Sequence, residues 1–477
     1  MRPWPRFLLR PEAWRAMADA LRSDPVPSLL GLWADTAHVH ALFMSGTPLL
    51  ASVRVEAGLF DALSPARPAA APFERMVHDL WGHLAAQGTD TRPLLDQGRW
   101  SVLRPLSARP APNSAAPEPP QFLGAVQPGH HLVSIGPIGG GAQDPVHLRI
   151  TAAGEAVVGM EARLGYAHRG VLALMRGKPL RSAAQLAARI AGDGTVAHSV
   201  AFARAVEAAL DIDPPPRGHA LRGIMAELER IASHLADLGG AGTGPLGTRC
   251  GALREGVLRA CDAAFGHRLM MDCVVPGGAA ADLAQAGRAA VLAGLDRIAA
   301  EAPSLLRGVD SLMRQTVAVG ANDPLLIESM APDGLVGRAA GRDDDARRLP
   351  GYSPYNRPHT PPPRPCRGDV DARLRLRLVE IHCSATLVRE WLAALPPGPV
   401  NVVVPAGSGE GLGVAEAPQG AIWHWLRLDA GAIATSFVRD PRWLHWPLIE
   451  AACRGAALDD VPLILRSFSP AVSGLEL

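Results

Sequence analysis

The sequence has a single lysine, Lys178, so almost every one of its 47 basic side chains is an arginine. Acidic residues number 46, which leaves a formal net charge of only +1. A chain without an excess of positive charge has no electrostatic basis for binding nucleic acid or an anionic membrane surface. Nucleic acid is therefore not expected among its partners.

Long apolar runs are missing as well. No segment approaches the ~18–20 consecutive apolar residues that a membrane-spanning helix requires. The N-terminal stretch MRPWPRFLLRPEAW is basic, but it lacks the continuous apolar core and the small-residue cleavage site of a signal peptide. We therefore expect a cytoplasmic chain with no membrane span of its own.

Close cysteine pairs are also absent. A C-x-x-C turn aims two thiolates at one metal, and zinc ribbons and iron–sulfur clusters usually depend on such turns. The six cysteines are instead scattered, which is typical of buried thiols in a reducing compartment; they are Cys250, Cys261, Cys273, Cys366, Cys383 and Cys453. The chain is not expected to hold a zinc ribbon or an iron–sulfur cluster itself.

Three segments can be distinguished along the chain. Residues 1–106 mix short alternating apolar stretches with helical patterns, which predicts a small α+β domain. Residues 107–122 are rich in proline, serine and alanine and predict a linker. Residues 123–477 are predicted to form a mostly helical domain, interrupted by a proline-rich surface loop over residues 349–368.

The strongest helical pattern is GHALRGIMAELERIASHLADLGG, residues 218–240. Its apolar residues recur at steps of three and four and form one broad stripe. Off that stripe, Glu227, Arg230 and His234 share a second face. This face fits a solvated set of ion pairs, or a buried polar face turned toward a cofactor or a partner.

Two glycine-rich stretches raise separate questions. In RIAGDGTVAHS, Gly192 and Gly194 each cost about 1 kcal/mol in a helix relative to alanine, so they predict a helix break or close packing. GSGEGLG, residues 407–413, follows the strand-like NVVVPA and superficially resembles a dinucleotide-binding loop. The helix that such a loop requires does not follow, so a nucleotide site is not expected.

Several stretches resemble, in the same order, the large subunit of membrane-bound nickel–iron hydrogenases of the formate-hydrogenlyase type and the quinone-site large subunit of respiratory complex I. The matching stretches are GPIGGGAQDPVHLRI, GYAHRG, RIAGDGTVAHSVAFARAVE, LRGIMAELERIASHLADLG, GLVGRAAGRDDDARRLPGY, GDVDARLRLRLVEIHCS, EAPQGAIWH and DDVPLILRSF. FERMVHDLWG and RPLLDQGRWSVLRPL resemble the small 30-kDa-type subunit of complex I. The resemblance implies an α+β fold: a mostly helical hydrogenase-large-subunit-like domain preceded by a small α+β domain.

The resemblance also implies that the metal site is gone. Active hydrogenases carry two pairs of cysteines, and four thiolates suit a nickel–iron centre. Here the pairs fall on Ala191 with Gly194 and on Ala471 with Gly474, none of which can bind a metal through its side chain. We therefore expect no nickel and no hydrogenase activity.

The quinone branch has an Asp-Tyr step at this place, which falls on Ala191 and Gly192. A histidine of the early Gly-Pro loop serves the quinone there, and His147 lies just beyond the corresponding loop. The catalytic residue remains unassigned, with Asp144, His147 and Glu416 as the candidates.

Arg169 and His234 match residues that lie near the 4Fe–4S cluster of the neighbouring small subunit in the family. A guanidinium or an imidazole near a cluster raises its reduction potential or takes up a proton. Arg338, Asp345 and Arg347 match a charged stretch of the family cavity, as does Glu416. They could form either a proton path or a buried salt-bridge network.

These implications predict a subunit of a membrane-associated oxidoreductase complex, peripheral on the inner face of the cell membrane. Its expected partners are an iron–sulfur small subunit and integral membrane subunits that move protons or other ions. No cofactor is expected to bind this chain directly, although quinone is possible. Two roles stay open: coupling of the partner's cluster to quinone or to ion-translocating subunits, and a non-catalytic structural scaffold.

Overall fold

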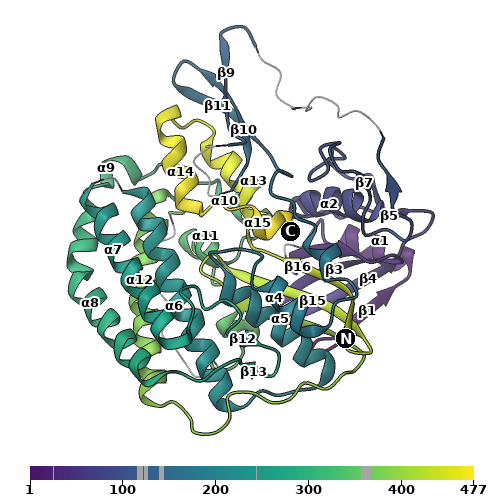
Figure 1. The fold of residues 1–477 in the computed structure, drawn as a ribbon. Helices are drawn as coiled ribbons and strands as arrows, with labels where there is room; N and C mark the ends of the chain where they lie inside the picture. Colours follow the sequence, from purple (N-terminus) through teal and green to yellow (C-terminus); the bar gives the residue numbers. More distant parts are fainter. Residues whose placement is uncertain (25, 115–121, 123–126, 139–143, 243, 356–366) are drawn as a thin grey trace.

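The computed structural model describes residues 1–24, 26–114, 122, 127–138, 144–242, 244–355 and 367–477. Figure 1 shows a bundle of long helices beside a central sheet, with the N-terminal unit on the other side of that sheet. The predicted α+β class, with a mostly helical large domain, is confirmed. Residues 115–121 of the predicted linker and residues 356–366 of the predicted loop lie outside the described residues.

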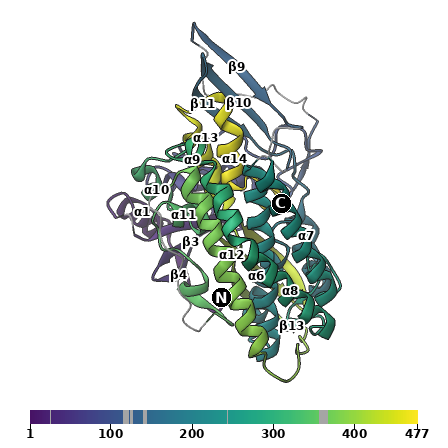
Figure 2. The same ribbon diagram turned by 90° about the vertical axis from the view of Figure 1, so that its left-hand side faces the viewer.

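The bundle consists of four long helices that run along the molecule (Figure 2); they are α6 (Pro216–Ala241), α7 (Pro245–Phe265), α8 (Gln285–Asp310) and α12 (Val370–Ala393). The predicted apolar stripe of α6 is buried throughout, including Leu221, Ile231 and Leu238. Asp369 caps the N-terminus of α12, and its carboxylate accepts a hydrogen bond from the N–H of Ala372 at 2.8 Å. Such a cap satisfies a free donor of the first turn.

The central sheet has the order β14–β15–β16 and is antiparallel; its strands are β14 (Gly409–Glu416), β15 (Ala421–Asp429) and β16 (Ala432–Arg439). Helix α5 (Thr195–Leu210) packs against β14. A Cβ atom on Gly409, Gly411 or Gly413 would lie within 2.2 Å of a backbone carbonyl oxygen of α5. These glycines thus allow a helix to approach a strand closely. NVVVPA is not a strand, because only Asn401 forms an isolated bridge there.

The N-terminal unit is built on a four-stranded sheet of order β1–β4–β3–β2, whose strands are β1 (Arg6–Leu9), β2 (Ser28–Ala34), β3 (His38–Ser45) and β4 (Thr47–Arg54). Strand β1 is parallel to β4, and the remaining pairs are antiparallel. Two helices accompany it, α1 (Pro11–Ala20) and α2 (Ala71–Trp81). The short pairs β5 (Leu59–Asp61) with β6 (Leu84–Ala86) and β7 (Val102–Leu103) with β8 (Ala111–Pro112) complete the unit.

The N-terminal unit and the large domain share one apolar core. Trp33 of β2 stacks on Phe437 of β16 with ring centroids 4.9 Å apart, and Phe73 of α2 stacks on Trp443 at 4.8 Å. The guanidinium of Arg439 donates a hydrogen bond to the carbonyl of Leu30 at 2.8 Å. The two units are therefore packed together as one body.

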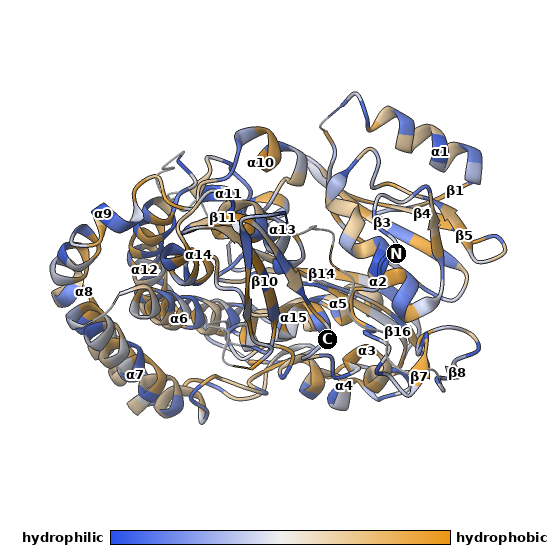
Figure 3. Cartoon of the chain, turned by 90° about the horizontal axis from the view of Figure 1, so that it is seen from above, coloured by the Kyte–Doolittle hydropathy of each residue, from blue (hydrophilic) through white to orange (hydrophobic). Residues whose placement is uncertain are grey.

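A third sheet, of order β11–β10–β9, projects at one end of the bundle (Figures 1 and 2); its strands are β9 (His130–Ile135), β10 (His147–Ala153) and β11 (Ala156–Arg163). In the view from above in Figure 3, β10 and β11 lie in the middle, with the long helices on one side and the N-terminal unit on the other. The shorter helices are α3 (Val171–Met175), α4 (Leu180–Ala187), α9 (Met313–Thr316), α10 (Pro324–Met330), α11 (Gly334–Ala339), α13 (Arg442–Cys453), α14 (Val461–Phe468) and α15 (Ser473–Glu476). Among the described residues, none of the helices has both the length and the apolar character to cross a membrane.

Candidate functional site

Two loops that are far apart in sequence meet at one place. One joins α4 to α5, where the two glycines break the helical pattern as predicted, and the other joins α14 to α15. The guanidinium of Arg169 donates to the carbonyls of Arg189 and Ile190 in the first loop, at 3.0 and 2.5 Å. It also donates to the carbonyl of Ser473 at 3.2 Å. Arg169 therefore connects both loops on which the resemblance placed the lost metal ligands.

Of the four positions on which the resemblance placed metal ligands, Ala191, Gly194 and Ala471 lie in these loops, and Gly474 lies in the short helix α15. Ala191 and Ala471 are 1% and 2% exposed. A Cβ on Gly194 would meet His198 at 3.5 Å, whereas a Cβ on Gly474 would lie only 2.1 Å from Oδ2 of Asp440. Within the part of the chain that the structure describes, no group of three or more His, Cys, Asp or Glu side chains could hold a metal ion. The alanine and glycine side chains at these four positions carry no donor atom, so they do not fit a nickel–iron centre.

An ion cluster stands beside these positions. Arg442, at the start of α13, pairs with Asp193 of the first loop and donates to Oδ2 of Asp440 at 3.0 Å. Burial alone would raise the pKa of Asp440, but Arg442 and His198 hold it well below its ordinary value. Burial raises the pKa of Asp193, and Asp440 adds to that rise while Arg442 opposes it. One guanidinium thus serves two carboxyl groups.

A cavity of about 420 Å³ opens next to the cluster, and Gly192, Asp193, Ala471 and Ser473 of the two loops line it. Asp144 contributes its carboxylate, which accepts hydrogen bonds from the N–H groups of Val472 and Ser473 at 2.9 and 2.8 Å. This predicted catalytic candidate therefore anchors the second loop.

Glu229 of α6 lines the same cavity. Its carboxyl accepts hydrogen bonds from the N–H groups of Val196 and Ala197 at 2.6 and 3.0 Å, at the N-terminus of α5. Burial raises the pKa of Glu229 to about 7, and the neighbouring Asp193 contributes to the rise. A proton can therefore be held here near neutral pH.

A second set of charges fills the space between α6, α12 and residues 338–355. Glu227 is fully buried, and its carboxylate accepts hydrogen bonds from Arg230 at 3.1 Å and from Arg347 at 3.3 Å. The hydroxyl groups of Tyr355 and Ser384 each donate to it at 2.5 Å. Burial would raise the pKa of Glu227, but these donors and the two guanidinium groups lower it to about 2. The carboxylate is therefore charged near neutral pH.

Arg338 occupies the centre of the remaining part of this network. It donates to Oε1 of Glu380 at 2.8 Å and to Oε1 of Glu416 at 2.7 Å, so two carboxyl groups share one guanidinium. Burial and the neighbouring Asp345 raise the pKa of Glu416 to about 7, whereas the pKa of Glu380 is held well below its ordinary value by Arg338 and His234 against the effect of burial. Asp345 pairs with Arg347 at 2.7 Å.

His234 completes the network. Its Nε2 lies 2.8 Å from Oε2 of Glu380, and the side chain is only 1% exposed. Burial lowers the pKa of His234, although Glu380 opposes that effect. The face of Glu227, Arg230 and His234 is therefore buried, which excludes the solvated alternative. It is turned toward α12 and residues 338–355 of the same chain.

The structure does not bring His147 to this site. The residue begins β10, and its ring meets that of Phe122 edge-on with centroids 5.8 Å apart. It is not among the residues that line the 420 Å³ cavity. Sequence reasoning missed Asp440, Arg442 and Glu380, since neither RDPRW nor the α12 pattern carries a motif that marks them.

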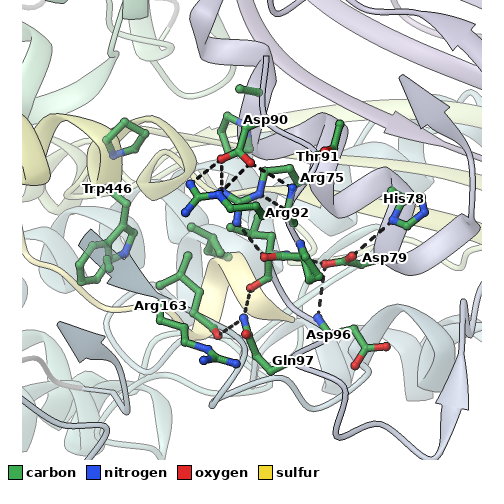
Figure 4. Close-up of a pocket in the computed structure, with 18 of the residues that line it drawn as sticks. Arg75, His78, Asp79, Asp90, Thr91, Arg92, Asp96, Gln97, Arg163 and Trp446 are labelled. Carbon is green, nitrogen blue, oxygen red and sulfur yellow. Dashed lines mark hydrogen bonds and ion pairs between the residues drawn. The ribbon is translucent and has the colours of Figure 1, made fainter. Parts of the chain in front are cut away.

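A larger cavity, of about 950 Å³, lies between the N-terminal unit and the large domain (Figure 4). Asp90 pairs with Arg75 at 3.2 Å and with Arg92 at 2.7 Å, and Arg92 reaches Glu161 of β11 at 3.4 Å. Trp446 of α13 forms part of the apolar wall. Of these pairs, the one between Arg92 and Glu161 crosses the junction, which indicates a structural role in joining the two units.

Two families match consecutive parts of the chain. Residues 169–237 match the nickel-dependent hydrogenase family, and residues 242–408 match the family described as the 49 Kd subunit of respiratory-chain NADH dehydrogenase. The first match contains Arg169, both loop glycines and His234, and the second contains Arg338 and Glu380.

Curated relatives span both kinds of complex. Formate hydrogenlyase subunit 5 of Escherichia coli is 28% identical over 456 residues, which cover 90% of this chain and 79% of that protein. An NADH-quinone oxidoreductase subunit of Dehalococcoides mccartyi is 30% identical over 318 residues, 64% of this chain and 86% of that protein. The alpha subunit of the membrane-bound hydrogenase of Pyrococcus furiosus is 28% identical over 370 residues, 72% and 86% of the two chains.

The fold is shared with a solved structure. A chain of the membrane-bound sulfane sulfur reductase, an archaeal respiratory membrane complex, superposes with a TM-score of 0.69. The match covers 74% of this chain and all of that chain at 21% identity. At this level of identity the likeness establishes the fold alone.

Proposed function

This chain belongs to the family of complex I 49-kDa subunits and nickel–iron hydrogenase large subunits, and we propose that it serves as the nickel-free large subunit of a membrane-associated respiratory complex. It docks an iron–sulfur small subunit on the face formed by the two loops. Through that subunit it couples to integral membrane subunits that move protons or other ions. The assembly lies peripherally on the cytoplasmic face of the cell membrane.

The observation that carries this proposal is the position of Arg169. Its side chain is exposed, yet it holds the loops of Ile190 and Ser473 together through three backbone carbonyls. An exposed guanidinium at such a junction can face a negatively charged cluster of a partner and raise its reduction potential. His234 lies deeper, so it can act on that cluster only through the buried charges around it.

The partner is tested by purification of the complex through a tag on this chain. Wild type should retain the small subunit and its 4Fe–4S signal in electron paramagnetic resonance. Arg169→Met should reduce the retained small subunit several-fold or shift the cluster's midpoint potential downward, because the positive charge and the loop contacts are lost together. Arg54→Met, at the exposed end of β4, serves as the control. Equal retention and an equal potential in both variants would contradict the proposal.

The absence of nickel is part of the same proposal. Ala191, Gly194, Ala471 and Gly474 provide no thiolate, and the space beside Gly474 is already filled. Elemental analysis of the purified complex should find no stoichiometric nickel, and the complex should neither take up nor evolve hydrogen. One nickel per chain would overturn this part.

A non-catalytic scaffold is the second candidate function. It is favoured by the closed ion pairs around Glu227 and Arg338 and by the loss of the quinone branch's Asp-Tyr step at Ala191 and Gly192. The two roles differ in whether electrons leave the cluster. Reoxidation of the reduced cluster by a soluble quinone analogue in the purified complex would support the coupling role. A cluster that stays reduced while other oxidants act normally would support the scaffold.

A further inference from the structure

The side chain of Asp440 occupies the place where a side chain at Gly474 would extend, and His198 lies one helical turn from Gly194, within ordinary contact distance of a Cβ there. A Cβ on Gly474 would meet Oδ2 of Asp440 at 2.1 Å, and a Cβ on Gly194 would approach His198. Asp440 and His198 are themselves neighbours, with 3.7 Å between Oδ2 and Nε2, and both are fully buried. The last positions of the two lost ligand pairs therefore face a single carboxylate–imidazole contact.

This contact belongs to the ion cluster of Arg442. The guanidinium pairs with Asp193 of the first loop and with Asp440. Its Nε donates to the carbonyl of Ser469, the first residue of the second loop, at 3.1 Å. One arginine thus connects the loop of Ala191, the loop of Ala471 and the start of α13. A metal with ligands from both loops would connect the same two loops.

We propose that the cluster of Asp193, Asp440, Arg442 and His198 fills the place of the lost metal and holds the two loops together by ion pairs. The register of the lost ligands rests on the family assignment that also underlies the proposed function. A buried ion pair holds its surroundings in one arrangement only while both partners are present, because removal of one leaves an uncompensated buried charge. Because this cluster fills the place of the metal, cysteines introduced at the four ligand positions would not by themselves restore one.

The steric part of this proposal can be tested by a double-mutant cycle between Gly474 and Asp440. Gly474 lies in α15 with an ordinary helical φ, so alanine is opposed there only by the contact with Asp440. Gly474→Ala should lower the urea midpoint of unfolding of the full chain. Gly192→Ala is the matched control, because no atom lies within 4 Å of a Cβ at that position.

Asp440→Ala should also lower the midpoint, because Arg442 loses a partner. The two changes together should cost clearly less than the sum of the single changes, because the space for the new methyl group is then free. Additive effects would overturn the proposal. If Gly474→Ala yields no soluble chain, recovery of soluble chain upon adding Asp440→Ala gives the same information, and failure to recover it counts against the proposal.

The electrostatic part is tested with Arg442→Met. This change should lower the urea midpoint markedly, and Asp193→Asn combined with it should recover part of the loss by removing an unpaired carboxylate. No recovery would show that Arg442 does not bridge the loops. These measurements concern the stability of the chain, whereas the proposed function is measured by the retained small subunit and the metal content. Failure of the ion-cluster proposal can therefore be told apart from failure of the proposed function.

Discussion

Nε2 of His234 and Oε2 of Glu380 lie 2.8 Å apart, and both side chains are about 1% exposed between α6 and α12. Burial lowers the pKa of this imidazole, with the nearby Arg377 and Arg230 adding to the effect. The ring is therefore neutral near pH 7 and serves Glu380 as a hydrogen-bond donor. The hydrogen bond between His234 and Glu380 also joins α6 to α12, so this part of α6 contributes to the packing of the bundle.

We predict that His234→Met lowers the free energy of unfolding by roughly 1–3 kcal/mol, because Glu380 loses a hydrogen bond in a buried place. Urea unfolding of the full chain measures this. Because the imidazole is neutral, the pH dependence of the partner cluster's midpoint potential should not change. A flatter slope in His234→Met would show instead that the imidazole takes up a proton when the cluster is reduced.

Arg338 should be far more sensitive than an arginine on the surface. Arg338→Met leaves Glu380 and Glu416 without their shared cation, and breaking a buried ion pair costs about 3–5 kcal/mol. Arg259→Met is the control, because Arg259 pairs with Glu255 at the surface and is 76% exposed. Exposed pairs contribute about 0–1 kcal/mol. Equal losses in urea midpoint for the two variants would mean that the buried network does not stabilise the bundle.

Because the carboxyl of Glu450 is buried, we predict that the stability of the folded chain depends on pH. The carboxyl of Glu450 accepts a hydrogen bond from the N–H of Ala162 at 2.7 Å, and burial together with Glu161 raises its pKa from 4.5 to about 7. The folded chain therefore binds this proton more tightly than the unfolded chain, and the stabilisation is lost as the pH rises from about 4.5 to about 7.

Glu450→Gln keeps a carbonyl acceptor but cannot ionise. Relative to wild type it should gain on the order of 1 kcal/mol in stability between pH 5 and pH 8. Thermal unfolding of both proteins across this range is the measurement. A difference between the two proteins that is constant with pH would contradict the raised pKa.

Cleavage of the proline-rich linker should not separate the two units. Residues 114–120, SAAPEPP, offer a polar and proline-rich stretch to a protease of broad specificity. The fragments should then elute together from a sizing column, because Trp33 stacks on Phe437 and Phe73 on Trp443 across the junction. They should separate only in denaturant. Separate elution in native buffer would show that the shared core is too weak to hold the units.

Local pattern predicted the long helix α6, the break at Gly192 and Gly194, and the mixed fold, because these depend on spacings of a few residues. It also placed Glu227, Arg230 and His234 on one face. The family resemblance singled out Arg169 and two segments far apart in sequence, and the structure brings Arg169 into contact with both.

Only the tertiary structure decided what surrounds those residues. Asp440 fills the space beside Gly474, Glu380 meets His234, and Arg442 connects two distant loops. Such contacts join residues far apart in sequence, so no local periodicity marks them. The glycines of β14 illustrate the same limit: their spacing resembled a nucleotide loop, but the close approach of α5 accounts for them. The sequence determined that alanine and glycine stand at the four positions that the resemblance indicates, and packing determined which side chains lie beside them.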